Sequence, residues 1–275
     1  MTIIDDDSDM TCSGNVEANL HESSVGVAGA SFQFDLSSNT CSNDASAEGN
    51  DIFKVVARKL ASGDGLLEID EVDAVGNCGH SLENVYTCQV NATTSGNYEL
   101  DVYHLIPGGL KGFYYTDNVL DDSRLDMIRT DAVVNFTWGT GPVTTFGRDF
   151  VSVRWEGYVR PTHSETYTFW LDVDDHARIW IDGHLLIDWW TFPHASSMLH
   201  AEHDLSAFET HEIILEYRDV LGNATARLLW SSESIPITAI PSSSLFYKVC
   251  NSFRKLVIVT QHISNTSLAS GTNTR

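Results

Sequence analysis

Short runs in which apolar and polar residues alternate cover much of the chain, and this period of two is typical of β-strands buried on one face. Three such runs are residues 150–155, 167–171 and 212–217. A fourth, residues 178–187, carries Asp182-Gly183 between two apolar halves. That dipeptide is a strong hairpin signal, because both turn residues adopt positive φ. The pattern predicts an all-β protein whose sheets pack face to face.

Polar and glycine-rich breaks divide the chain into segments. Residues 1–15 read as a flexible acidic end, and a Pro-Gly-Gly break separates a first strand region, residues 16–107, from a second, residues 108–247. Residues 248–275 fit neither region, so we expect a tail or the start of a further, truncated domain. A helical pattern occurs at Leu125–Ile128, and it is short.

The chain is strongly acidic, with a net charge of -22 at pH 7. Residues 1–110 alone hold 18 Asp and Glu against 3 Lys and Arg. Such a surface repels phosphate backbones and anionic lipid, so we expect no nucleic-acid partner. No stretch reaches the ~18 apolar residues that span a bilayer, so we expect no direct membrane insertion. Divalent cations are attracted, although acidity also serves solubility alone.

Five cysteines occur, none in a Cys-x-x-Cys pair, which argues against a structural zinc site. Four lie in the N-terminal part, where an even number suits disulfides with three possible connectivities. We favour Cys78 with Cys88 and Cys12 with Cys41, which leaves Cys250 over. Buried free thiols are the alternative.

Four Asn-x-Ser/Thr sequons favour a secreted or cell-surface glycoprotein, and they begin at Asn91, Asn135, Asn223 and Asn265. The first residues nevertheless lack the basic region and apolar run of a signal peptide. The chain is therefore either a fragment of a longer secreted protein, which we prefer, or intracellular.

The first strand region resembles a filamin-type immunoglobulin repeat. The resemblance rests on Val25-Gly26 before a Phe-Gln-Phe strand, and on Tyr86–Val90 followed by Ser95–Val102, which is similar to the closing strand of these repeats. Short strands over about ninety residues also suit an immunoglobulin-like sandwich. The resemblance implies a spacer or a partner-binding edge, and it transfers no catalytic residue.

The second strand region carries motifs that agree in order and spacing with the PA14 (protective-antigen) family, which it resembles over about 140 residues. They lie at Gly109–Tyr115, Val153–Tyr158, Glu165–Phe169 (Glu where Gly is usual), Asp174–Gly183, Leu215–Tyr217, Ala224–Trp230 and Ile240–Tyr247. The resemblance implies a β-sandwich that occurs in toxins, adhesins and glycosidases, usually outside the cell. Its known ligands are often carbohydrates, but many members are structural modules, so the fold alone does not decide function.

Asp174-Asp175 is the chemical centre of this resemblance. Adjacent strand residues point to opposite faces, so neighbouring carboxylates do not normally bind one ion. A cis peptide would bring both to the same side, and such a bond needs something to stabilise it. Calcium is suitable, since it takes about 6–8 oxygen ligands in flexible geometry. In lectin-like members the pair binds calcium, and the ion binds sugar hydroxyls, a role that the resemblance carries onto Asp174 and Asp175.

Further ligands for such an ion are expected from a later loop, residues 219–223. Asn223 is the first candidate and Asp219 the second. Asn223 also begins a sequon, and a glycan there would obstruct an open sugar-binding ion. The alternative is that Asp174-Asp175 forms an exposed turn that orders a loop without metal.

Trp189-Trp190, with Phe192, form a candidate ligand surface, because exposed aromatic rings stack on sugar faces and Trp also supplies a donor. Aromatic residues of a sandwich are more often core residues, which is the alternative here. The remaining strand tryptophans are expected in the core: Trp155, Trp170, Trp180 and Trp230.

These observations favour an extracellular, non-enzymatic binding or adhesion protein that binds calcium and a carbohydrate or glycoprotein. The alternative is a structural building block of an extracellular filament, coat or matrix, in contact with other copies or neighbouring domains. No nucleophile elbow, phosphate loop or zinc-protease helix occurs, so we expect no enzyme.

Overall fold

The computed structural model describes residues 16–19, 25–27, 31–38, 52–60, 69–82, 85–191 and 197–260. The chain forms two compact units: unit 1 contains residues 1–104 and 249–275, and unit 2 contains residues 105–248. Strands dominate both units, so the predicted all-β class is confirmed. No helix in the described ranges is long and apolar enough to cross a membrane.

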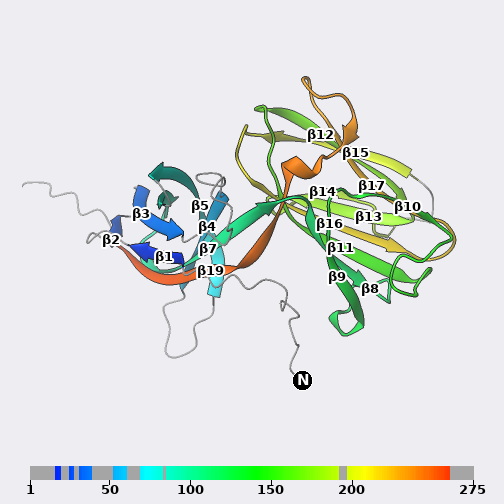
Figure 1. Cartoon of the computed structure of the whole chain (residues 1–275), viewed down its shortest axis with the longest axis horizontal. Helices are drawn as coiled ribbons and strands as arrows, with labels where there is room; N and C mark the ends of the chain where they lie inside the picture. Colours follow the sequence, from blue (N-terminus) through cyan, green and yellow to red (C-terminus); the bar gives the residue numbers. More distant parts are fainter. Residues whose placement is uncertain are drawn as a thin grey trace, which may run out of the picture. The chain divides into compact units, whose positions relative to one another are not determined.

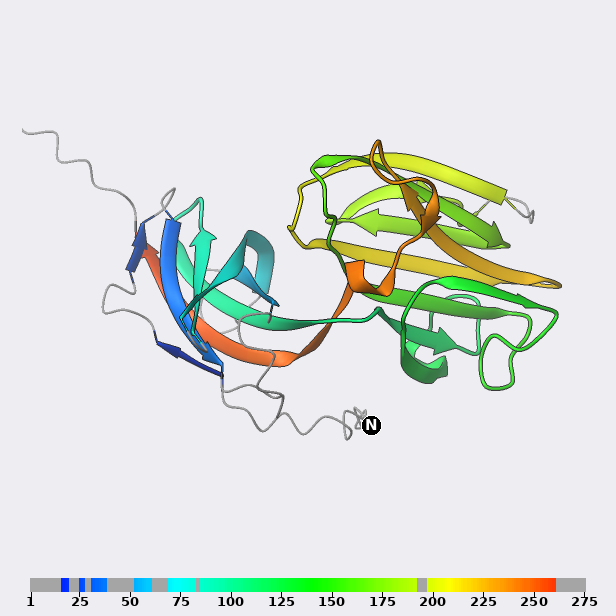
Figure 2. The same ribbon diagram turned by 45° about the horizontal axis from the view of Figure 1, so that its top comes forward.

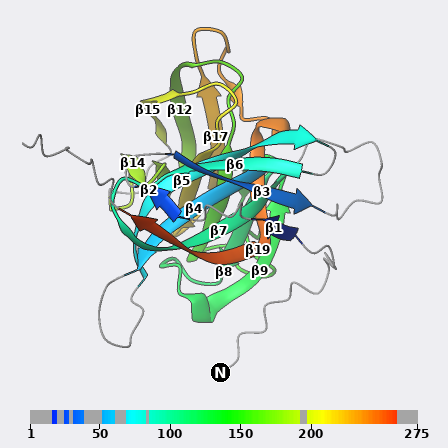
Figure 3. The ribbon, with the colours of Figure 1, turned by 90° about the vertical axis from the view of Figure 1, so that its left-hand side faces the viewer.

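Unit 1 is built on one hydrogen-bonded path of strands, in the order β1-β3-β6-β5-β4-β7-β19 (Figure 3). Its strands are β1 (Val16–Asn19), β2 (Val25–Val27), β3 (Ser31–Ser38), β4 (Ile52–Leu60), β5 (Ile69–Leu82), β6 (Val85–Asn91), β7 (Gly96–Pro107) and β19 (Leu245–Thr260). An immunoglobulin sandwich divides its strands between two sheets. The predicted filamin-type repeat is therefore not shown by the described strands.

A disulfide joins two neighbouring strands of unit 1. Cys78 in β5 lies directly opposite Cys88 in β6, and the two are bonded, which confirms this predicted pairing. Cys88 belongs to the buried core of the unit, and Cys78 packs against that core. The predicted pairing of Cys12 with Cys41 lies outside the described residues.

The last described strand belongs to unit 1. Residues Ile258–Thr260 of β19 pair in parallel with Val25–Val27 of β2. The sequence predicted a tail or the start of a further domain for residues 248–275; the described residues 249–260 are grouped with unit 1, and residues 261–275 lie outside the described residues. The apolar run in β19 is short, and the strand pairs with strands that are distant in sequence. Periodicity along the chain does not reveal such pairing.

Unit 2 contains two sheets (Figure 1, Figure 2). One has the order β9-β8-β11-β16-β13-β14, and the other has the order β10-β17-β12-β15, with β18 beside β17. The elements are β8 (Leu110–Tyr115), η1 (Asp122–Arg124), β9 (Leu125–Asp131), β10 (Asn135–Gly139), β11 (Val151–Val159), β12 (Glu165–Asp174), β13 (His176–Ile181), β14 (His184–Asp188), β15 (Ser197–Leu205), β16 (His211–Asp219), β17 (Ala224–Ser231), β18 (Thr238–Ala239) and η2 (Ser242–Ser244).

Alternation along these strands places one row of side chains in the shared core of unit 2. In β12 the buried row is Tyr167, Phe169, Leu171 and Val173. β17 contributes a similar row of alternate residues, which ends at Trp230. Four strand tryptophans were predicted to lie in the core, and this is confirmed for the two that belong to the buried rows. Trp155 and Trp230 are buried, whereas Trp170 and Trp180 are half-buried.

The turns and the short helix were predicted with different success. Asp182 and Gly183 have φ of 48° and 76° between β13 and β14, so the predicted hairpin is confirmed. The helical pattern at Leu125–Ile128 was wrong, because these residues belong to β9, which pairs with β8. Pairing with a neighbouring strand satisfies the main chain there, and tertiary contacts of this kind override weak local propensity.

A buried carboxylate joins three strands of unit 2. Asp131, the last residue of β9, is 7% exposed. Its Oδ2 accepts hydrogen bonds from the Tyr114 hydroxyl in β8 and from Trp155 Nε1 in β11, the latter at 2.7 Å. Its Oδ1 accepts from Arg129 Nε at 2.7 Å. Burial and the adjacent Asp131 carboxylate raise the pKa of Tyr114, so its hydroxyl remains a donor.

We expect Asp131→Ala to lower the free energy of unfolding of unit 2 by about 3 kcal/mol, because it leaves the donors of Trp155 and Tyr114 buried without an acceptor. Tryptophan fluorescence during urea unfolding reports on this unit, since all 7 tryptophans lie between residues 138 and 230. As a matched control, Asp172→Ala removes an ion pair whose side chains are 29% and 39% exposed. That variant should lose less than about 1 kcal/mol, and equal losses would contradict this role of Asp131.

Candidate functional site

Three loops of unit 2 are held together by hydrogen bonds at one end of the sandwich. The β10–β11 loop contacts the β16–β17 loop, because Phe150 donates its N–H to Val220 O at 3.2 Å and Gly222 donates to Asp149 Oδ1 at 2.8 Å. The link between β12 and β13 joins them, since Val220 donates its N–H to Asp175 Oδ2 at 2.8 Å. Residues distant in sequence are thereby brought beside Asp174 and Asp175.

The aspartate pair lies between β12 and β13, and its peptide bond is cis. Asp175 is buried, with 3% of its surface exposed, and Asp174 is half-buried. The Tyr217 hydroxyl in β16 donates to the main-chain oxygen of Asp174. This hydrogen bond joins the connection between β12 and β13 to a residue of the core. Asp175 is therefore not exposed as the metal-free alternative assumed, although it does order the β16–β17 loop by accepting hydrogen bonds from Val220 and Leu221.

Asp219 lies at the end of the buried row of β16. Ile213, Leu215, Tyr217 and Asp219 alternate along this strand, and each is at most 1% exposed. Neither carboxylate oxygen of Asp219 has a hydrogen-bond partner among the described residues. Buried carboxylates are normally paired or hydrogen-bonded, so this one requires an explanation.

Several carboxylates act on one another at this end of unit 2. Burial, followed by Asp175, Asp149 and Asp174, raises the pKa of Asp219 to about 7. Burial and then Asp175 also raise the pKa of Asp174. Burial, followed by Asp219, Asp175 and Asp174, raises the pKa of the Tyr217 hydroxyl. The cluster therefore repels further negative charge and favours a proton or a cation.

The oxygen donors of Asp219 and Asp175 fit some metal ions better than others. Within the described part of the chain, no three His, Cys, Asp or Glu side chains are grouped closely enough to hold an ion by themselves. The buried oxygens of Asp219 without partners and the adjacent Asp175 nevertheless offer hard oxygen donors. The set fits an ion that also accepts main-chain, amide and ligand oxygens, as calcium does, better than one that requires a complete side-chain cage.

Asn223 is exposed in the β16–β17 loop, directly after Gly222, whose φ is 103°. The structure brings Asp219 into the carboxylate cluster, whereas Asn223 is exposed on the loop and accessible to a ligand or to a glycan. Asn91 and Asn135 are also exposed, as their sequons require. Asn265 lies outside the described residues.

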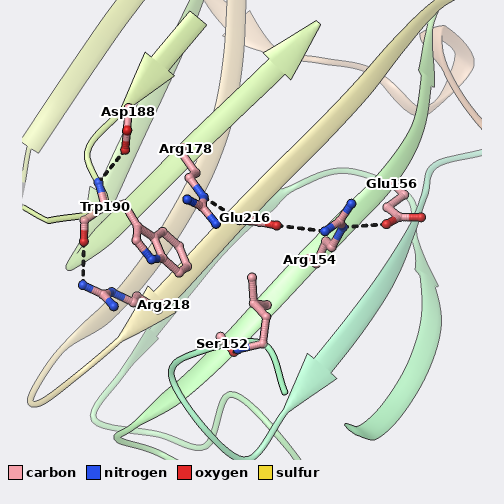
Figure 4. A network of polar contacts seen from close by, with 9 residues as sticks. Ser152, Arg154, Glu156, Arg178, Asp188, Trp190, Glu216 and Arg218 are labelled. Carbon is pink, nitrogen blue, oxygen red and sulfur yellow. Dashed lines mark hydrogen bonds and ion pairs between the residues drawn. The ribbon is translucent and has the colours of Figure 1, made fainter. Parts of the chain in front are cut away.

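Trp189 and Trp190 follow β14 and are both half-buried. Trp189 donates its N–H to Ala177 O at 2.9 Å, which ties the segment to β13. The guanidinium groups of Arg178 and Arg218 lie 4.4 and 4.6 Å from the centroid of the Trp190 ring (Figure 4). This ring is therefore already stacked on protein groups. Phe192 lies outside the described residues.

The Trp190 ring is part of a charged network on the outer row of the sheet. Glu216 is 3% exposed and accepts hydrogen bonds from Arg154 and Arg178 on the two adjacent strands (Figure 4). Arg218 donates to the main-chain oxygen of Trp190, and burial, then Arg178, lowers the pKa of its guanidinium. Since Arg218 and Asp219 are consecutive in a strand, the network and the carboxylate cluster face opposite sides of the sheet.

The model of the PA14 domain matches residues 107–244. The chain belongs to the PA14 domain family. The match covers the strands and loops of unit 2 and confirms this part of the predicted resemblance. Nothing in the match extends to unit 1, so the family membership concerns the PA14 unit, which is the name used for unit 2 below.

Three known proteins are similar to part of this chain. The anti-sigma-I factor RsgI3 of Acetivibrio thermocellus is 44% identical over 140 residues, which are 50% of this chain and 21% of that protein. A solved anti-sigma factor domain-containing protein is 38% identical, with 52% of this chain and 49% of that chain covered and a TM-score of 0.49. The solved PA14 sugar-binding domain of an RTX adhesin is 15% identical, with 52% and 99% covered and a TM-score of 0.43. This chain thus spans about a fifth of the curated relative.

Sequence reasoning missed Asp149, which precedes β11 in a loop without a recognisable motif. Its contact with Gly222 joins two loops separated by 73 residues, and no local pattern indicates such a contact. A signal did exist for the burial of Asp219. It continues the apolar alternation of Ile213, Leu215 and Tyr217, and that period places its carboxylate in the core row of the PA14 unit.

The pKa of Asp219 predicts how its effect on stability depends on pH. Its folded value, about 7, lies above the ordinary 3.8. The folded state therefore holds this proton more tightly than the unfolded chain, and stability is lost as pH rises between these two values. In buffer containing a chelator, we expect Asp219→Asn to raise the thermal midpoint of the PA14 unit by a margin that is small near pH 4 and largest above pH 7.

Tryptophan-fluorescence melts of wild type and variant across pH 4 to 8 measure this margin. Asp172→Asn, which removes the charge of one partner in the half-exposed ion pair with Arg227, serves as the control. Its thermal midpoint should not rise above that of the wild type at high pH. A margin for Asp219→Asn that stays constant across the pH range would contradict the raised pKa.

Proposed function

We propose that the PA14 unit is a calcium-dependent carbohydrate-binding module of a surface or adhesion protein and has no catalytic role of its own. The proposed ion ligands are the carboxylates of Asp174, Asp175 and Asp219, which in the described part of the chain are not grouped closely enough to hold an ion without further oxygen ligands. Asn223 supplies a further oxygen when its sequon is not glycosylated. The calcium supplies positive charge and open coordination positions for hydroxyl groups.

The observation that carries the proposal is the buried, unsatisfied carboxylate of Asp219. Burying an ionised carboxylate without a partner costs on the order of several kcal/mol. A proton relieves this penalty near or below pH 7, but a divalent cation relieves it at every pH at which it binds. Asp175 and Asp149 add negative charge from two other loops, so three carboxylates together, and not Asp219 alone, attract the cation.

Carbohydrate is the ligand class that this chemistry supports best. Calcium takes about 6–8 oxygen ligands, and the side chains here supply only part of that number. Neutral hydroxyls of a sugar complete the shell without adding charge to an already acidic cluster. Anionic ligands are disfavoured by the net charge of -22. The motif that carries this role in lectin-like members of the family is present here as Asp174-Asp175.

A module that binds a ligand serves adhesion and signal sensing equally well. The segment 44% identical to the anti-sigma-I factor is about a fifth of that protein. The match is confined to that segment, so the relative's name does not decide between these two roles for this chain. A structural building block remains the alternative, and calcium binding separates the two.

We expect calcium titrated into the full chain in a calorimeter to bind once, with a dissociation constant between about 1 μM and 1 mM. The Asp174→Ala/Asp175→Ala variant should show no heat of binding, because two ligands are lost. Asp219→Asn, which keeps the shape but not the charge, should weaken binding at least about tenfold. Asn223→Ala should have a smaller effect.

Asp172→Ala is the control, since Asp172 lies in the same strand as Asp174 but pairs with Arg227. It should bind calcium as the wild type does. If the wild type shows no heat at millimolar calcium and its thermal midpoint is the same in calcium and in chelator, the ion site is absent and the structural building block becomes the better account.

We further expect the full chain to bind immobilised glycosides in calcium and to release them in chelator. The measurement is surface binding to a panel of β-linked glucose, galactose, mannose and xylose. Binding of any panel member that persists in chelator, or in the Asp174→Ala/Asp175→Ala variant, would contradict a role for the ion in holding the sugar.

A further inference from the structure

Phe150 lies beside the carboxylate cluster at the end of the β10–β11 loop. Its N–H donates to Val220 O at 3.2 Å, and the N–H of Val220 donates to Asp175 Oδ2 at 2.8 Å. The next residue, Val151, lies opposite Asp219 in the pairing of β11 with β16. Phe150 is thereby connected to two of the proposed ion ligands through a single intervening residue in each case.

The conformation of Phe150 is unusual for its side chain. Its φ is 53°, in the left-handed region that bulky residues rarely adopt, and the side chain is 52% exposed. Burial of the ring therefore does little to offset the unfavourable backbone. Conformations of this kind concentrate at functional sites, where the surrounding structure holds them. Phe150 meets this description, since hydrogen bonds and strand pairing fix the residues on both sides of it.

Two observations distinguish this position from other exposed apolar residues. Leu221, adjacent to Val220 in the neighbouring loop, is 64% exposed, so a second exposed apolar side chain belongs to the loop that Phe150 contacts. Trp190, the aromatic candidate from the sequence, already stacks on Arg178 and Arg218 and faces the other side of the sheet. Phe150, by contrast, is an exposed aromatic residue whose main chain is connected to Asp175 and Asp219 by hydrogen bonding and strand pairing.

We propose that the Phe150 ring is the platform on which a sugar held by the ion stacks. This inference rests on the proposed calcium-dependent carbohydrate binding and names the residue that contacts the apolar face of the sugar. A pyranose presents C–H groups on one face and hydroxyls around its edge, so it can stack on an aromatic ring while its hydroxyls reach the ion. The net charge of -22 disfavours an anionic lipid surface as the occupant.

The test replaces Phe150 with Gly, which adopts positive φ without strain. Phe150→Gly should keep the thermal midpoint of the wild type or raise it, and calorimetry should show unchanged calcium affinity. Binding to the glycoside panel in calcium should weaken about tenfold, because the apolar contact is lost. Phe150→Tyr, which retains the ring, should bind the panel within about twofold of the wild type.

Phe146→Gly is the matched control, because Phe146 lies in the same loop and is 90% exposed. The residue before it, Thr145, donates its N–H to Asp126 and not to a residue of the carboxylate cluster. It should bind both calcium and sugar as the wild type does. Sugar binding by Phe150→Gly at the wild-type level would overturn the platform and leave the proposed function intact. A wild-type chain that binds calcium but none of the sugars would overturn both.

A lower thermal midpoint for Phe150→Gly would also count against the platform, because it would assign the ring a structural role. Binding of the wild type, but not of Phe150→Gly, to phosphatidylcholine vesicles without sugar would overturn the inference in favour of a lipid surface.

Discussion

The pairing of β11 with β16 is the constraint on which the PA14 unit depends. Nine residues of each strand pair in register, from Val151 opposite Asp219 to Val159 opposite His211. A slip by one residue would exchange the two faces of a strand. It would bring Arg218 and Glu216 into the core and turn Tyr217 and Asp219 outward. The register therefore decides both where the core lies and which carboxylates meet at its end.

The two faces of β16 show how one strand carries opposite chemistry. On the outer row, Glu216 is buried but its charge is balanced by arginines from both adjacent strands, with Trp190 stacked beyond them. On the inner row, Tyr217 supports Asp174, and Asp219 is buried without a donor. Arginines thus balance the charge of Glu216 on the outer row, whereas the inner cluster favours a proton or a cation. This difference is the reason why the inner end is the one we propose for binding.

The fold of the PA14 unit was predictable because its signals are local. Period-two alternation marked β11, β12 and β16, and Asp182-Gly183 marked a hairpin whose φ values the structure confirms. The same reasoning was wrong at Leu125–Ile128, where pairing with β8 decides the strand. In unit 1, alternation indicated strands, but their order along one path depends on contacts between distant segments, and the predicted filamin-type repeat is not shown.

The sequence by itself determined the class of strands, the aspartate pair with its family resemblance, and the bridge of Cys78 with Cys88, since each depends on neighbouring residues or short spacings. Tertiary structure alone decided that Asp149 acts electrostatically on Asp219, that arginines cover Trp190, and that Phe150 is presented in a left-handed conformation. These features arise where loops from different strands meet. Their contacts join residues tens of positions apart, and no periodicity or motif encodes a contact of that range.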